Sequence, residues 1–175
     1  EEIQAVCDRT REQGATLKMD FSEKALEQPV VYQIDCTYYS ALGQDDAAYL
    51  CARAIQFFAP GIPQVYYVGL LAGENDNGLA ERTGVPRNIS RHNYTKEEAA
   101  QQDQKPVVQK LKRLMRFRNR YPGFEGPSVV EETPDDRLVI SRCFGEYRTV
   151  LDMDLGGKHF RITYREDGAD RLLEL

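Results

Sequence analysis

The stretch G-I-P-Q-V-Y-Y-V-G-L-L at residues 61–71 decides the fold that we expect for this chain. It is a nearly continuous apolar run behind a Gly-Pro break, with a helix-patterned segment before it and another after it. Such a run is typical of a parallel strand that is buried on both faces. The polar stretch that follows predicts a long loop at the carboxyl end of this strand, which is where α/β barrels place their chemistry.

The segments around this strand show helical patterns. Residues 45–61 predict a helix with an aspartate cap at its start and a Pro-Gly stop at its end. Residues 106–120 predict a second helix, whose first turn holds a proline. The connection at 72–104 is predicted to be a structureless loop, and a loop of that length in a compact domain is more often functional than idle.

The two ends of the chain differ in their sequence patterns. Residues 2–13 predict a weak amphipathic helix, residues 15–29 are irregular, and residues 30–39 predict a short strand or an extended loop. After residue 126 the sequence changes to short alternating segments separated by turn signals. This C-terminal part is predicted to be a small antiparallel sheet.

Charge and cysteine content exclude several classes of protein. With 23 basic and 28 acidic residues the net charge is -5, so we expect no nucleic-acid partner, and we interpret the basic window 105–120 as a solvated helix face. No apolar run is long enough to span a membrane. The cysteines lack ligand spacing, so we expect reduced, mostly buried thiols of a cytoplasmic protein and no metal site. These cysteines are Cys7, Cys36, Cys51 and Cys143.

The order of these elements resembles the end of glycoside hydrolase family 13 enzymes, whose eighth barrel strand carries a phrase similar to P-G-I-P-Q-V-Y-Y-V-G. Within that family the chain resembles the sucrose phosphorylase group. The phrases that carry this resemblance are Y-Q at 32–33, T-Y-Y-S-A-L-G at 37–43, A-R-A-I-Q-F-F at 52–58, L-A-G-E-N-D at 71–76 and R-N-I-S-R-H at 87–92.

The resemblance implies the last part of a (β/α)8 TIM barrel followed by a small antiparallel C-terminal β-domain. Residues 1–43 would form a B′-like segment. Residues 44–123 would form the final barrel unit, with helix 7, strand 8, a long loop and helix 8, and residues 124–175 the β-domain. Because the chain begins with Glu1 and not with Met, we expect it to be a portion of a longer enzyme.

The implied activity is retaining transfer of an α-glucosyl unit to inorganic phosphate, which yields α-glucose 1-phosphate from sucrose or a related donor such as glucosylglycerate. This chemistry needs two carboxyl groups. In the family these groups lie upstream of the matching region, so we expect no catalytic residue here, no cofactor and no turnover by this chain alone. The expected partners are the α-glucoside, phosphate and the rest of the polypeptide, and a homodimer is left open.

Three residues match substrate-binding positions of the family. By resemblance, Arg87 matches the arginine of the family phrase G-R-D-I-N that reaches the glucosyl unit. A guanidinium can hold two oxygens in a fixed geometry, which suits sugar hydroxyls. Its structural alternative is an arginine that anchors the loop by pairing with an acid. By resemblance, Tyr32 and Gln33 match the Tyr-Gln pair that lines the acceptor subsite in the family. An aromatic face and an amide are suited to bind a polyol. Their alternative is a pair buried in a β-strand.

Other positions depart from the family pattern. The aspartate expected to contact fructose is Val30 here, and G-R-D-I-N-R-H-Y-Y has become P-R-N-I-S-R-H-N-Y at 86–94. Loss of a charge in an acceptor pocket changes preference, which makes glycerate or glycerol an alternative acceptor. We interpret His92 as a structural loop residue and residues 74–76 as a solvated turn. The competing hypothesis for the whole chain is a non-catalytic carbohydrate-binding or interaction module.

Overall fold

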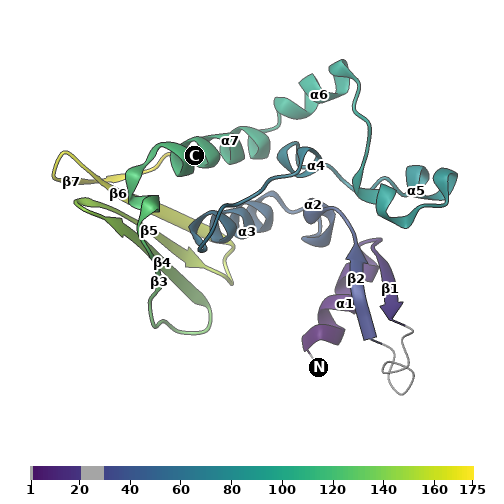
Figure 1. The fold of residues 1–175 in the computed structure, drawn as a ribbon, viewed down its shortest axis with the longest axis horizontal. Coiled ribbons are helices and arrows are strands. Elements are labelled where there is room, and N and C mark those ends of the chain that lie inside the picture. Colours follow the sequence, from purple (N-terminus) through teal and green to yellow (C-terminus); the bar gives the residue numbers. More distant parts are fainter. Residues whose placement is uncertain (1, 21–29) are drawn as a thin grey trace. The chain divides into compact units, whose positions relative to one another are not determined.

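The fold is that of a computed structural model, which describes residues 2–20 and 30–175. The chain forms two compact units (Figure 1). Unit 1 consists of Glu1–Asp45 and Tyr66–Gln104, and unit 2 consists of Asp46–Val65 and Lys105–Leu175. The predicted helix at 45–61 and the predicted helix at 106–120 therefore both fold together with the C-terminal sheet.

Unit 2 contains two long helices, α3 (Asp46–Phe58) and α7 (Pro106–Arg120), and a five-stranded antiparallel sheet. Each strand pairs with the next one along the chain, as the turn signals predict (Figure 1). The predicted C-terminal sheet is confirmed, although its last strand was not foreseen. The strands are β3 (Ser128–Val130), β4 (Arg137–Phe144), β5 (Tyr147–Asp154), β6 (His159–Glu166) and β7 (Ala169–Leu172).

The core of unit 2 lies on one face of this sheet. Ile140, Leu151 and Ile162 are direct neighbours across β4, β5 and β6, and all three are buried. Helix α3 contacts these strands and also α7. The buried residues of α7 are all apolar: Val107, Val108, Leu111 and Leu114. Because residues two apart on a strand share a face, the alternating pattern of β5 places its charged residues on the opposite side.

Unit 1 is built from short elements. Helix α1 (Glu2–Glu12) contacts the antiparallel pair β1 (Thr16–Asp20) and β2 (Val30–Asp35). Strand β1 falls in a segment that we expected to be irregular. The remaining elements are α2 (Tyr38–Ala41), α4 (Tyr67–Leu70), α5 (Asn77–Thr83), η2 (Pro86–Ser90) and α6 (Lys96–Asp103).

Two predictions for the centre of the chain are wrong. The strand predicted at 63–71 does not form: residues 61–66 contain no strand, residues 67–70 are the single turn of α4, and Ile62 and Tyr66 are exposed. A parallel strand needs neighbours to bond its backbone, and no described strand pairs with this segment. The predicted structureless loop at 72–104 instead contains α5, η2 and α6.

The structure also describes the cysteines and the length of the helices. All four cysteines are free; Cys7 and Cys51 are buried, Cys36 is half-buried and Cys143 is exposed. Among the described residues, no helix has both the length and the apolar character needed to cross a membrane.

Candidate functional site

The predicted acceptor residues lie on β2, on the surface of unit 1. Tyr32 is 62% exposed, so the alternative that it is buried in a strand is wrong. Tyr32 and Gln33 border a hollow of about 450 Å³ between β2 and α1, to which α1 contributes Ile3 and Val6. An aromatic ring and an amide at the rim of an open hollow can contact a small polyol.

A buried charge fixes the conformation of this strand. Asp35 is 5% exposed; its Oδ2 lies 3.0 Å from the Nζ of Lys18 on β1, and its Oδ1 accepts a 2.6 Å hydrogen bond from Gln33 Nε2. The amide of Gln33 is thus held along β2. Lys18 and Gln33 are cross-strand partners, and both side chains bind the carboxylate of Asp35.

Asn75 connects three separate segments of unit 1. Its Oδ1 accepts the backbone N–H of Thr37 at 2.7 Å, and its Nδ2 donates to the carbonyl of Gln13 at 3.1 Å. Its own backbone N–H donates to Ser40 Oγ at 2.9 Å. Asn75 therefore links the end of α1 and the start of α2 to the loop that carries Arg87. The prediction of a solvated turn at 74–76 is wrong for Asn75, which is half-buried.

Arg87 lies on η2, which starts with Pro86 and is anchored by the buried Ile89. Its side chain is exposed, and no acidic side chain in the described part of the chain pairs with it. The alternative role of Arg87, in which it anchors the loop by pairing with an acidic side chain, is therefore not observed. Helix η2 contacts β2, which brings the segment of Arg87 against the strand of Tyr32 and Gln33. Arg87 itself does not border the hollow beside α1.

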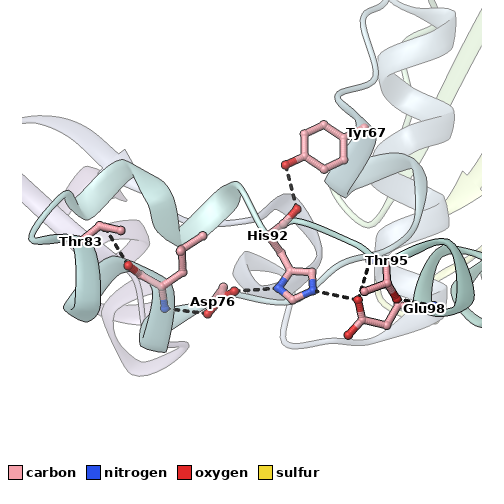
Figure 2. A network of polar contacts seen from close by, with 7 residues as sticks. Tyr67, Asp76, Thr83, His92, Thr95 and Glu98 are labelled. Carbon is pink, nitrogen blue, oxygen red and sulfur yellow. Dashed lines mark hydrogen bonds and ion pairs between the residues drawn. The ribbon is translucent and has the colours of Figure 1, made fainter.

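His92 and Asp76 form the centre of a polar network (Figure 2). His92 Nδ1 lies 2.7 Å from Asp76 Oδ2, and the other carboxylate oxygen of Asp76 accepts the N–H of Leu79 at the start of α5. These two hydrogen bonds lower the pKa of Asp76 below its ordinary value, and the bond with His92 has the larger effect. Since an ionised carboxylate only accepts hydrogen bonds, Nδ1 of His92 carries a proton.

A cluster of aromatic rings lies beside this network. The hydroxyl of Tyr67 donates to the backbone carbonyl of His92 at 2.8 Å, and the ring of Tyr94 meets those of His92 and Tyr67 edge to face. Burial is the main reason why the pKa of Tyr94 is raised. Gly73 makes this packing close, because a Cβ there would lie 2.6 Å from Val68 Cγ1 and would also meet the Tyr94 hydroxyl.

Sequence reasoning foresaw a structural role for His92 and missed those of Asn75 and Asp76. The partners of Asn75 lie 35 to 62 residues away, so no local pattern signals them. Asp76 lies 16 residues from His92; its position just before a helical segment was the one available signal, since aspartate is a common N-cap. No group of side chains suited to hold a metal ion occurs among the described residues.

The chain is similar to known phosphorylases. It is 51% identical to a glucosylglycerol phosphorylase of Marinobacter adhaerens over 146 residues, which cover 82% of this chain and 30% of that protein. It is 44% identical to a sucrose 6(F)-phosphate phosphorylase of Thermoanaerobacterium thermosaccharolyticum, over 95% of this chain and 35% of that protein. The chain thus spans about a third of the length of these relatives. No protein-family model matches it.

A solved structure shows the same fold. The crystal structure of sucrose 6F-phosphate phosphorylase from Thermoanaerobacter thermosaccharolyticum superimposes with a TM-score of 0.94 at 43% sequence identity. The match covers 98% of this chain and 36% of that chain. The antiparallel C-terminal sheet is therefore part of a known enzyme architecture.

Proposed function

We propose, from the premise that this chain belongs to the sucrose phosphorylases and related glucosyl phosphorylases of glycoside hydrolase family 13 as their C-terminal portion, that it is part of an enzyme that cleaves an α-glucoside with phosphate. Full-length homologues are phosphorylases. The product would be α-glucose 1-phosphate, with retention of configuration. The observation that carries this proposal is the 51% identity to a glucosylglycerol phosphorylase.

Arg87 is proposed to bind the glucosyl unit. Its exposure and the absence of an acidic partner among the described residues leave its donors available for sugar hydroxyls. Helix η2 holds it against the strand that presents Tyr32 and Gln33, for which we propose contacts to the leaving group or acceptor. No catalytic residue is proposed in this chain. The two carboxyl groups of a retaining mechanism would come from the rest of the polypeptide.

Glycerol is the acceptor that we favour over fructose. The first residue of V-V-Y-Q lacks the carboxylate that the sucrose phosphorylase pattern places there, and the relative with 51% identity acts on glucosylglycerol by its name. The side chain of Val30 lies outside the described residues. A site built without that charge is expected to discriminate against the fructosyl group.

We further propose that residues 61–66 become the eighth strand of a TIM barrel in the whole enzyme, with the predicted boundaries at 43 and 123. Its support is that residues 62–66 form neither a helix nor a turn, and that Ile62 in unit 2 and Tyr66 and Tyr67 in unit 1 are exposed. An apolar surface of this kind fits a missing neighbour. It argues against a free-standing binding module, which we would expect to be polar there.

The test is an assay of the whole enzyme with inorganic phosphate and three donors: glucosylglycerol, glucosylglycerate and sucrose. We expect release of α-glucose 1-phosphate, fastest from glucosylglycerol, and a loss of about a hundredfold in kcat/KM for Arg87→Ala. A clear preference for sucrose would refute the acceptor assignment. Hydrolysis of the donor at a rate that does not depend on phosphate would refute the proposal that the enzyme is a phosphorylase.

A further inference from the structure

The loop that carries Arg87 is closed on itself at its two ends. It runs from Asp76 to His92, and these two side chains meet at 2.7 Å (Figure 2). The backbone N–H of Asp76 also donates to the carbonyl of Ile89 at 2.8 Å. Ile89 belongs to η2 and His92 follows this helix closely, so both contacts hold the segment that carries Arg87.

A third contact fixes the closed end to another element. The Tyr67 hydroxyl binds the carbonyl of His92 at 2.8 Å, and Tyr67 belongs to α4. On its far side, His92 Nε2 lies 3.9 Å from Glu98 Oε2. That carboxylate is itself held, because Glu98 and Thr95 form a capping box at the start of α6. The backbone of His92 is thus held by α4, and its imidazole lies between the N-cap of α5 and Glu98 of α6.

We propose that His92 is a positioning residue for Arg87, acting through the Nδ1–Asp76 contact that closes the loop. This inference rests on the proposed function, since it assigns to His92 the task of presenting the sugar-binding guanidinium. Arg87 has no side-chain partner of its own in the described part of the chain, so its placement depends on the backbone of η2. A small displacement of a binding group costs up to about a hundredfold in rate.

Two variants of His92 distinguish the effect of its hydrogen bond with Asp76 from the effect of its side-chain volume. The amide nitrogen of His92→Asn can take the place of Nδ1 and still donate to Asp76. The longer side chain of His92→Gln places its amide nearer the position of Nε2, on the side of Glu98. We expect His92→Asn to retain the closed loop and His92→Gln to lose it.

Hydrogen exchange in the whole enzyme reports the loop directly. We expect the amides of residues 87–92 to exchange at least about tenfold faster in His92→Gln than in wild type, and at nearly the wild-type rate in His92→Asn. Equal protection in the wild type and in both variants would overturn the proposal. This measurement does not require activity, so it stays decisive if the proposed reaction is wrong.

Kinetics then test whether the closed loop acts through Arg87. We expect His92→Gln to lower kcat/KM for the donor about ten- to a hundredfold, with His92→Asn restoring most of it. In the Arg87→Ala background, His92→Gln should have less than about a twofold effect, because residues that act as one unit are not additive. Additive losses would overturn the positioning role. An Arg87→Ala enzyme with full activity would instead refute the sugar-binding assignment in the proposed function.

Discussion

Arg142 is a charged residue inside the core of unit 2, only 5% exposed. Its Nη1 donates to the carbonyls of Phe58 and Ala59 at 3.2 and 3.1 Å, and its Nη2 donates to that of Phe124 at 2.6 Å. Burial lowers its pKa. Arg118 donates to the neighbouring carbonyl of Phe57, so two cations bind the C-terminal end of α3, where the helix dipole favours positive charge.

We expect Arg142→Met to lower the free energy of unfolding by about 2–4 kcal/mol, because buried carbonyls would lose their donors. Phe58 would be affected least, since its carbonyl also accepts from Ser128 Oγ. Arg171→Met, which removes an exposed ion pair with Glu166, is the control and should cost less than about 1 kcal/mol. Urea unfolding measures both, and equal effects would show that the buried hydrogen bonds contribute nothing.

Asp76 should make stability depend on pH. Its pKa is lowered in the folded state, first by His92, so its contribution is complete above the ordinary pKa of 3.8 and is lost as pH falls through the lower folded value. Asp76→Asn keeps an oxygen for the cap of α5 and removes the charge. We expect the difference in urea unfolding between the wild type and this variant to shrink as the pH is lowered below 3.8. Parallel curves at every pH would contradict this.

At the scale of elements, the turn after α4 depends on Gly73. Its N–H donates to the carbonyl of Val68 at 2.8 Å, and an added Cβ would lie 3.0 Å from that oxygen and 2.6 Å from Val68 Cγ1. Val68 is buried and cannot yield easily. We expect Gly73→Ala to destabilise unit 1 by about 1–3 kcal/mol.

Gly78 provides the matched control, because it lies within α5. A Cβ there would meet the flexible end of Arg82 at 3.0 Å and would lie in ordinary contact, at 3.7 Å, with Asp76 Oδ1. Gly78→Ala should be neutral, or stabilise the helix by up to about 1 kcal/mol. Thermal unfolding measures both variants. A Gly73→Ala protein as stable as Gly78→Ala would mean that the turn relaxes around the methyl group.

The long elements were predictable where local signals agree with the packing. The helix at 46–58 has an aspartate at its start and a Pro-Gly stop, and the strands of the sheet have turn residues between them. The run at 61–71 has equally strong local signals and still fails, because a strand needs partners that no residue within the run supplies. The sequence predicts no structure in the loop at 72–104, because its helices α5, η2 and α6 are short and are held by contacts with distant residues.

At the scale of the whole molecule, sequence resemblance proposes Arg87, Tyr32 and Gln33 as substrate-binding residues but gives no account of what holds them. Their supports are the ion pair of Lys18 with Asp35, the links made by Asn75 and the contact between Asp76 and His92. Each joins residues that the fold brings together from separate elements. Such contacts depend on the folded backbone, so they become visible only once the elements are placed.

The exposed segment at 61–66 yields a prediction about the whole enzyme. Ile62 is 92% exposed in this chain, so Ile62→Asp should change the stability of the 175-residue chain by less than about 0.5 kcal/mol. If the segment is a barrel strand in the whole enzyme, the same substitution buries a charge there and should cost several kcal/mol, on the order of 3 or more. Urea unfolding of both forms measures the difference. Equally small effects would mean that this segment has no neighbouring strands, and the barrel proposal would then fail.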